Sequence, residues 1–307
     1  MGVLIMAAVA VLVLAVAGDE DGGLISIVQD GAAVEKVAGG FQFTEGPIWD
    51  NRGFLLFSDI PANTIYKWTP GGGAPVVFRK PTNHANGNTL DLEGRLISCE
   101  HDGRVSRTEK DGSVVMIADK FEGKRLNSPN DVVVKSDGSI YFTDPPYGIE
   151  KEKEELGFYG VYRLKGGALT VLTKIHNKPN GLAFSPDEKH LYVNNSDPNE
   201  NLVRVYDVKP DGTLAKARVF ADLKSPGKDG VADGMKVDVK GNVYTTGPEG
   251  VWIFAPDGKL LGKIKPPEVP ANVAFGDSDY KTLYITARTS VYRIRLKIAG
   301  IAPGHRH

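Results

Sequence analysis

The sequence has a single cysteine, Cys99, among its 307 residues, so an internal disulfide is excluded. The paired Cys and His spacings of structural zinc sites are missing as well. Thirty-seven Lys and Arg residues nearly balance 38 Asp and Glu residues, and the formal net charge is -1. No basic field is therefore present to attract nucleic acid. The absence of a Gly-x-Ser-x-Gly elbow, a phosphate-binding loop and a dinucleotide fingerprint argues against serine hydrolases and nucleotide-dependent enzymes.

Long apolar runs are missing beyond the first residues. Residues 1–17 are apolar throughout, and Ala15-Val16-Ala17 fits a small-residue cleavage site before Gly18. We therefore expect residues 1–17 to be a signal peptide and the mature chain to be secreted or periplasmic. The segment lacks a Lys or Arg at its start, which leaves an uncleaved N-terminal membrane anchor as the alternative. No other contact with a membrane is expected.

Turn residues are abundant, with 36 Gly and 19 Pro, and they punctuate a repeated phrase. In each copy a short apolar strand leads into a polar turn and a second strand follows, which is the pattern of a β-hairpin. The copies occupy residues 47–57, 89–97, 132–142, 182–193, 236–244 and 273–285. Their spacing of roughly 40 to 50 residues is typical of propeller blades.

Further strands complete each unit. A third strand follows each hairpin, for example at 64–68, 161–164 and 203–206, and a fourth occurs at 76–78 and 114–117. Four antiparallel strands in each of six units predict an all-β, six-bladed β-propeller. The last unit lacks a fourth strand of its own, and residues 33–37 are expected to fill that place and remove an exposed edge. We assign residues 18–300 to this propeller and 301–307 to a flexible tail.

The inner strands of a propeller line a central channel, so the residues that begin them should converge. All six carry a side-chain oxygen: Glu45, Asn88, Asn130, Asn180, Asp233 and Asn272. Carboxylate and amide oxygens without Cys or His select hard cations such as Ca²⁺ or Mg²⁺. Ligands from separate blades favour Ca²⁺, which accepts looser geometry than Mg²⁺. The alternative is that these Asn-Gly and Asp-Gly pairs are ordinary turn residues.

Several phrases together resemble the senescence marker protein/gluconolactonase/luciferin-regenerating-enzyme family, which includes regucalcin. They are Phe43–Trp49, Ser128-Pro129-Asn130-Asp131, Pro179–Ser185 and Asp233–Asp238, and the likeness extends from about Phe43 to about Leu296. The stretches His84–Thr89, Ser98–His101 and Gly123–Asp131 resemble the bacterial gluconolactonase branch in particular.

The resemblance implies metal ligands at Glu45, Asn180 and Asp233, with Asn130 as a fourth ligand or a substrate contact. It also implies that Asp233 is the general base. Regucalcin-type members place a substrate-binding Arg two residues before the Asn matched by Asn130, and this chain has Ser128 there. The sugar-recognising residues are therefore not carried over. As substrate-contact candidates we take Asn130, His84, Asn88, His101 and Tyr147, with structural hydrogen bonding as the alternative for both histidines and a packed aromatic as the alternative for Tyr147.

These residues predict a metal-dependent lactonase that hydrolyses a sugar (aldono-) lactone such as gluconolactone to the free acid. Ca²⁺ is the expected ion, with Mg²⁺, Mn²⁺ or Zn²⁺ as alternatives. The ion would stabilise the oxyanion, and Asp233 would take the proton of the attacking water. Because a cation keeps its ligand ionised, Asp233 would mainly orient that water. The alternatives are a related arylesterase or organophosphate hydrolase, and a non-enzymatic metal-binding propeller.

Overall fold

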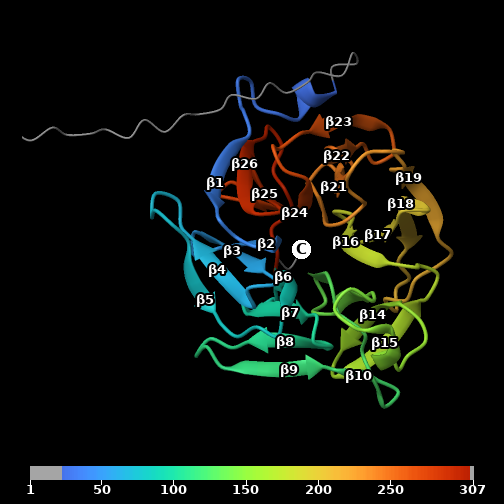
Figure 1. The fold of residues 1–307 in the computed structure, drawn as a ribbon. Coiled ribbons are helices and arrows are strands. Elements are labelled where there is room, and N and C mark those ends of the chain that lie inside the picture. The colour runs from blue at the N-terminus through green and yellow to red at the C-terminus, as the bar shows by residue number, and fades with distance from the viewer. Residues whose placement is uncertain (1–22, 305–307) are drawn as a thin grey trace, which may run out of the picture.

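Six four-stranded antiparallel sheets surround a central opening in the computed structural model, which describes residues 23–304 (Figure 1). The predicted signal peptide or anchor lies outside the described residues. Within residues 23–304 the helical structure consists of two 3₁₀ turns, η1 (Leu24–Ser26) and η2 (Lys151–Lys153). No helix in this range is long and apolar enough to cross a bilayer. The predicted all-β, six-bladed propeller is confirmed.

The first three blades each run from the innermost to the outermost strand in chain order. Blade 1 comprises β2 (Thr44–Asp50), β3 (Phe54–Asp59), β4 (Thr64–Trp68) and β5 (Val76–Arg79). Blade 2 comprises β6 (Ala85–Leu90), β7 (Leu96–Glu100), β8 (Arg104–Thr108) and β9 (Val114–Ala118). Blade 3 comprises β12 (Val132–Val134), β13 (Ile140–Asp144), β14 (Gly160–Lys165) and β15 (Ala168–Thr173). A short hairpin, β10 (Lys120–Phe121) and β11 (Lys124–Arg125), precedes blade 3.

Blades 4 and 5 repeat this order, and blade 6 departs from it. Blade 4 comprises β16 (Pro179–Phe184), β17 (His190–Asp197), β18 (Glu200–Asp207) and β19 (Arg218–Asp222). Blade 5 comprises β20 (Met235–Val237), β21 (Val243–Gly247), β22 (Gly250–Phe254) and β23 (Leu260–Ile264). Blade 6 comprises β24 (Pro270–Gly276), β25 (Thr282–Ala287), β26 (Ser290–Arg295) and β1 (Glu35–Gly39).

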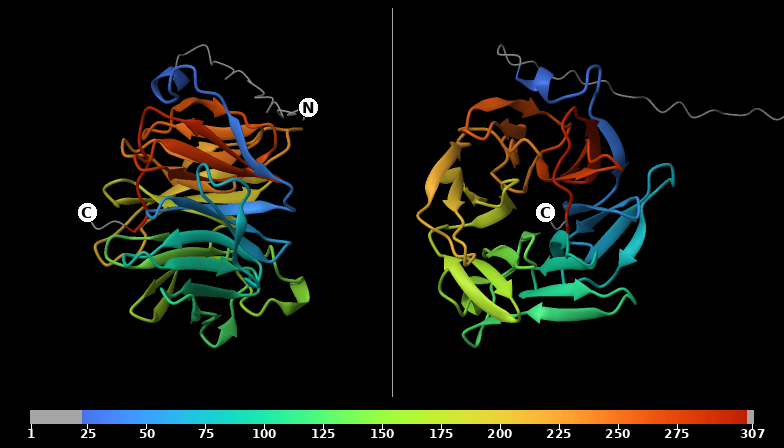
Figure 2. Two further views of the ribbon diagram at one scale, coloured as in Figure 1. Left: turned by 90° about the vertical axis from the view of Figure 1, so that its left-hand side faces the viewer. Right: turned by 180° about the vertical axis from the view of Figure 1, so that it is seen from behind.

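The N-terminal strand closes the ring, as the sequence predicted. β1 pairs antiparallel with β26, and Glu35 lies opposite Arg293 in the register. The guanidinium of Arg293 also donates to the Glu35 carboxylate at 2.9 Å. Figure 2 shows this first strand, in blue, beside the red strands of the last blade. Closure protects the edge of the last blade and joins the two ends of the propeller.

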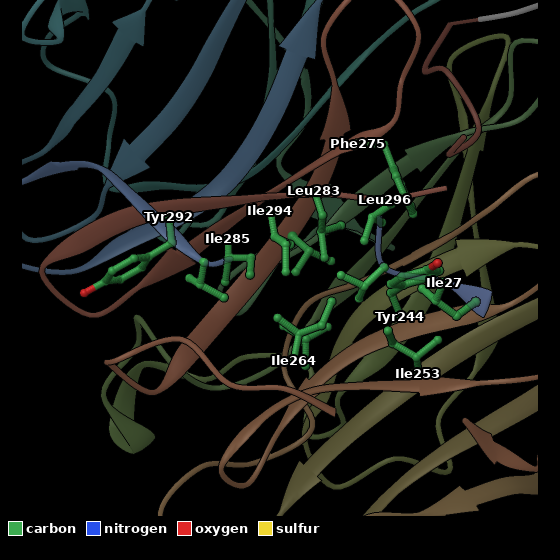
Figure 3. Close-up of a cluster of buried hydrophobic side chains, with 14 of the residues drawn as sticks. Ile27, Tyr244, Ile253, Ile264, Phe275, Leu283, Ile285, Tyr292, Ile294 and Leu296 are labelled. Atoms are coloured by element: carbon green, nitrogen blue, oxygen red, sulfur yellow. The ribbon is translucent and has the colours of Figure 1, made fainter. Parts of the chain in front are cut away.

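The hydrophobic core is distributed between neighbouring blades. In the cluster of Figure 3, residues of blade 6 such as Leu283 and Ile285 pack against Ile253 and Ile264 of blade 5, with Ile27 beside them. The inner strand β2 is buried along its whole length, whereas the outer strand β5 is exposed or half-buried. Four of the six inner strands, β2, β6, β16 and β24, are buried along their whole length, which fixes the residues that begin them.

The two ends of the channel differ. The inner strands of a propeller run in the same direction, so their first residues meet at one end and their last residues at the other. At the second end, Ile301–Gly304 line a small pocket together with Val134, Phe184 and Phe275. Ile301–Gly304 belong to the segment expected to be a flexible tail. The predicted ligands begin the inner strands and so meet at the first end, where the candidate site lies.

Candidate active site

The inner strands of four blades are irregular where they enter the channel. Each has a β-bulge or register shift at that point, between Glu45 and Ile48, Ala85 and Asn88, Pro179 and Leu182, and Pro270 and Asn272. A bulge places two residues opposite one and redirects a side chain. The channel end of the propeller is thus built from bulged strands.

Glycines at these points let each blade touch the next. A Cβ at Gly46, Gly87 or Gly181 would overlap the backbone of the following blade, at Asn86, Asn130 and Asp233 respectively. A Cβ at Gly234 would overlap the side chain of Asn272. Gly87 and Gly181 also donate backbone hydrogen bonds to the carbonyls of Asn130 and Asp233, at 2.8 and 2.9 Å. The alternative interpretation as turn residues therefore does not hold for these pairs, because they lie where neighbouring blades make close contact.

The glycine contacts also identify equivalent positions. The residue before the glycine is the one that reaches the channel: Glu45 in blade 1, Asn86 in blade 2, Asn180 in blade 4 and Asp233 in blade 5. For blade 2 the sequence predicted Asn88, which lies two residues further along the strand than Asn86. In blade 6 it chose Asn272, which follows Ala271, the residue whose carbonyl accepts from Gly234 N–H.

A pocket of about 280 Å³ opens at this end of the channel. It is lined by six of the predicted site residues: Glu45, Asn130, Asn180, Asp233, His101 and Tyr147. Asn86 and the apolar residues Phe43, Ile60, Pro61 and Val231 complete its wall. Residues from five blades or their connecting loops thus meet around one space, whereas Asn88 and Asn272, which were also expected to converge there, do not line it.

Glu45 is held in place by its own blade and by the last one. Its Oε2 accepts hydrogen bonds from the Asn272 amide at 2.9 Å and from the Gly46 N–H at 2.5 Å. Burial and the nearby charge of Asp131 raise the pKa of Glu45 to about 7, although both hydrogen bonds lower it. A carboxylate in this environment is costly to ionise unless a cation is near.

Asp131 and Asp233 bring the number of carboxyl groups to three. Burial and the charges of Glu45 and Asp131 raise the pKa of Asp233 well above its usual range, even though Asp233 keeps some exposure to the pocket. Burial also raises the pKa of Asp131, whose Oδ2 has no hydrogen-bond partner among the described residues. The positive charge of Lys236 lowers the pKa values of Glu45 and Asp131 and so partly opposes the effect of burial on these two groups.

This donor set fits a hard cation. Glu45, Asn130, Asn180 and Asp233 supply only oxygen ligands, and the unpaired Asp131 Oδ2 adds a negative charge close to them. Within residues 23–304 no three His, Cys, Asp or Glu side chains form a metal-binding group by themselves. A site here would therefore depend on the two asparagine amides as well as the carboxylates.

His101 faces the pocket in its neutral form. Burial and the neighbouring His84 lower the pKa of His101 to about 4. The Asn86 side-chain amide lies 3.0 Å from His101 Nε2, and because an amide nitrogen can only donate, Nε2 accepts and Nδ1 carries the proton. Asn86 was not among the residues predicted from the sequence, although the Asn86-Gly87 pair matches Asn180-Gly181 and could have identified it.

Two predicted substrate contacts do not line this pocket. Asn88 Nδ2 donates to Gly46 O and Ser58 Oγ, both at 2.8 Å, and its Oδ1 accepts from Ser98 Oγ at 2.7 Å. Asn88 therefore joins blades 1 and 2. His84 is half-buried and its Nδ1 lies 3.0 Å from Asp102 Oδ1. This contact is a hydrogen bond of the structural kind that was the alternative for His84.

Comparison with known proteins agrees with this geometry. Residues 43–289 match the SMP-30/Gluconolactonase/LRE-like region. A gluconolactonase of Zymomonas mobilis is 37% identical, over 90% of this chain and 85% of its own. A solved gluconolactonase from Xanthomonas campestris is 34% identical with a TM-score of 0.82, covering 89% of this chain and 92% of its own.

A more distant structure shares the architecture. Regucalcin from Agrobacterium tumefaciens, a calcium-binding protein, aligns with a TM-score of 0.73 at 20% identity, over 86% of this chain and 93% of its own. At this level of identity the likeness concerns the fold. The pattern match over residues 43–289 and the identity with gluconolactonases decide the relationship. The chain belongs to the SMP-30/gluconolactonase/LRE-like family.

Proposed function

We propose that this chain hydrolyses sugar lactones, such as gluconolactone, to their free acids in the channel pocket. The proposed cofactor is a divalent cation, Ca²⁺, with ligands from four blades: Glu45, Asn130, Asn180 and Asp233. The reaction class rests on the relatives: the prediction of a gluconolactonase-type lactone hydrolase is confirmed by the match to a gluconolactonase over 90% of this chain. The substrate and the metal are the proposed parts.

One observation supports the metal site above all others. Two carboxyl groups, Glu45 and Asp233, line one pocket, and a third, Asp131, lies close enough for its charge to raise the pKa of both, while burial raises the pKa of all three. Such a group of acids is unfavourable in a scaffold with no cation. A bound divalent cation would offset the repulsion, polarise the substrate carbonyl and acidify water.

The chain's own residues have separate parts in this proposal. Asp233 accepts a hydrogen bond from the attacking water and directs its oxygen at the carbonyl carbon. The water loses one proton as it attacks the carbonyl carbon. The ring oxygen gains one proton as the ring C–O bond breaks and becomes a hydroxyl of the product acid. Asn130 and His101, both on the pocket wall, are placed to hydrogen-bond substrate oxygens. The apolar residues Phe43 and Val231 limit the access of bulk water.

Ca²⁺ is favoured over smaller ions by the way the donors are arranged. The four ligands lie at or just before the starts of four different inner strands, two of which are bulged there, so their spacing is not that of one regular element. Ca²⁺ tolerates irregular geometry and high coordination numbers, whereas Mg²⁺ demands a near-ideal octahedron. The lack of Cys or His ligands also disfavours Zn²⁺.

The test is lactone hydrolysis by the purified chain before and after chelator treatment. Activity on glucono-δ-lactone above the spontaneous rate should disappear on chelation and return best with Ca²⁺ in a series of Ca²⁺, Mg²⁺, Mn²⁺ and Zn²⁺. Phenyl acetate and a phosphotriester, assayed in parallel, should be much poorer substrates than the lactone. Faster turnover of either of them would make the chain an arylesterase or organophosphate hydrolase instead.

Two variants sharpen this test. Asp233→Ala should lose both metal binding and turnover, since it removes a ligand and the group that orients the water. Asp222→Ala is the matched control, because Asp222 is exposed at the end of β19 and accepts a hydrogen bond from the Lys224 N–H. Full activity of Asp233→Ala would eliminate the proposal.

We also propose that the chain is exported, which rests on the apolar residues 1–17 alone. Expression in a Gram-negative host, followed by fractionation and mass determination, tests this. Export with cleavage predicts a mature N-terminus near Gly18 in the periplasmic or extracellular fraction. A full-length chain in the membrane fraction would indicate an anchor.

A further inference from the structure

The loop after β13, Pro145-Pro146-Tyr147-Gly148, brings an aromatic side chain to the pocket without being part of the blade repeat. The Tyr147 phenol lies beside Asn180, Asp233 and Ser196. Burial and the charge of Asp233 raise its pKa to about 12, while hydrogen bonding with Ser196 and Asn180 lowers it. Tyr147 thus presents a neutral hydroxyl next to two of the proposed metal ligands.

A buried hydrogen-bond chain holds this loop from below. Ser128 is fully buried, and its Oγ accepts a hydrogen bond from the Gly148 N–H at 2.8 Å. The Ser128 N–H in turn donates to Asp144 Oδ1 at 2.7 Å. Asp144 is the last residue of β13 and also accepts from the Asn127 N–H at 2.9 Å. Gly148, the residue after Tyr147, is therefore tied through Ser128 to the end of β13, the second strand of blade 3.

The loop is also packed tightly from the side. A Cβ at Gly148 would overlap the Cβ of His101 and lie 2.6 Å from Ser128 Oγ. The loop backbone therefore rests directly on His101 and Ser128. Since His101 and Tyr147 both line the pocket, this contact fixes the distance between two substrate-facing side chains.

We propose that Tyr147 makes the chain selective for polyhydroxylated lactones, because its phenol forms a hydrogen bond with a ring hydroxyl of the substrate. Ser128 is the positioning residue for Tyr147. The inference rests on the proposed lactonase function. The reacting carbonyl would lie at Asp233 and Asn180, so a phenol beside both side chains reaches a substituent of the same ring. A site that hydrogen-bonds a substrate hydroxyl binds an analogue lacking that hydroxyl more weakly, because the hydrogen bond between protein and substrate is lost.

The experiment compares glucono-δ-lactone with δ-valerolactone, which has the same ring without hydroxyls. In the metal-loaded enzyme, Tyr147→Phe should lower kcat/KM for glucono-δ-lactone about tenfold, mainly by raising KM, and change δ-valerolactone less than about twofold. Ser128→Ala should reduce the same selectivity in the same direction. The double variant should be no worse than Tyr147→Phe alone, because both changes remove one interaction.

Controls separate this role from a structural one. Tyr159→Phe is the matched variant, since the Tyr159 hydroxyl donates to Glu154 at 3.0 Å and does not line the pocket. It should leave the selectivity unchanged. Metal affinity, measured by calorimetry, should be the same in wild type, Tyr147→Phe and Ser128→Ala.

The outcomes distinguish the inference from the function on which it rests. A wild-type chain that hydrolyses neither lactone overturns the proposed function. A wild-type chain that hydrolyses glucono-δ-lactone, with unchanged selectivity in Tyr147→Phe, overturns the role of Tyr147 alone. Strictly additive losses in the double variant would show that Ser128 does not act through Tyr147.

Discussion

The side-chain amide of Asn272, on the innermost strand of the last blade, donates a 2.9 Å hydrogen bond to Oε2 of Glu45, on the innermost strand of the first. The bond joins the two ends of the propeller at a proposed metal ligand. Asn272 Oδ1 in turn accepts from the Val273 N–H at 2.8 Å, which fixes the orientation of the amide. Ring closure and the arrangement of the ligands are thereby linked.

The variant Asn272→Ala should weaken metal binding without removing a ligand. Loss of the donor leaves Glu45 Oε2 with the Gly46 N–H as its remaining hydrogen-bond donor, and the loss of a partner that orients a ligand costs about 10- to 100-fold in affinity. Calorimetric titration of the chelator-treated protein with Ca²⁺ measures it. Asn199→Ala, a change in the turn between β17 and β18, is the control and should bind normally. Equal affinities for the two variants would contradict the role of Asn272.

Metal affinity should depend on pH through Glu45. The pKa of this carboxyl is raised to about 7 in the metal-free protein, so cation binding must displace a proton below that pH. Affinity for Ca²⁺ should fall as the pH is lowered from 8 to 5.5, with measurable proton release in weakly buffered solution. A constant affinity over this range, with no protons released, would show that Glu45 is already ionised before binding.

The same pKa shift predicts the pH dependence of stability for the metal-free protein. A carboxyl whose pKa is raised on folding stabilises the fold below its ordinary value of 4.5, and that stabilisation is lost as the pH rises through about 7. Thermal unfolding of chelator-treated protein should therefore show a Glu45 contribution that decreases over this window. Glu45→Gln, which cannot ionise, should have a flatter profile. Parallel profiles for the two proteins would refute the prediction.

The contact between blades 1 and 2 should not tolerate a side chain at Gly46. Gly46 has φ +50°, and a Cβ there would overlap the Asn86 carbonyl. Gly46→Ala should lower the free energy of unfolding by about 3 kcal/mol or more, since it combines backbone strain with overpacking. Gly71→Ala isolates the strain, because Gly71 has φ +73° and open space around it; its cost should be about 1 kcal/mol. Chemical denaturation compares the two, and similar losses would discount the close contact.

A buried ion pair between blades 1 and 2 should contribute to stability. Arg79, at the end of β5, donates to Oε1 of the fully buried Glu100 at 2.8 Å. Arg79→Met would leave that carboxylate with Arg104 as its one cation and with Ser106 and Asn83 as neutral donors, and the free energy of unfolding should fall by about 3 kcal/mol. Arg218→Met removes an exposed pair with Asp207 and should cost under about 1 kcal/mol. Equal costs for both variants would contradict the prediction.

The sequence anticipated much of the site because the blade repeat is short and regular. Glu45, Asn180 and Asp233 each precede a glycine at the start of an inner strand, and the structure brings all three to the pocket. Tyr147 and His101 were candidates from loops, and they also line it. The errors occurred in blade 2, where Asn86 rather than Asn88 lines the pocket, and in blade 6, where Asn272 holds Glu45 and does not line the pocket.

Those errors have a physical cause. Side chains alternate faces along a strand, and a bulge shifts that alternation by one residue without any change in composition. The shift between Ala85 and Asn88 is stabilised by contacts with the neighbouring blades, so blade 2 alone does not reveal it. Asp131 was overlooked for a similar reason, because its unpaired Oδ2 becomes evident only once burial is known.

The sequence by itself determined the number of blades, the strand that closes the ring and the oxygen-rich chemistry of the channel, because these follow from local periodicity and residue type. Only the tertiary structure decided which oxygens converge, that Ser128 supports the Tyr147 loop, and that Asn272 holds Glu45. Those relationships join residues up to 227 positions apart in the chain, and they exist only after the blades have closed on one another.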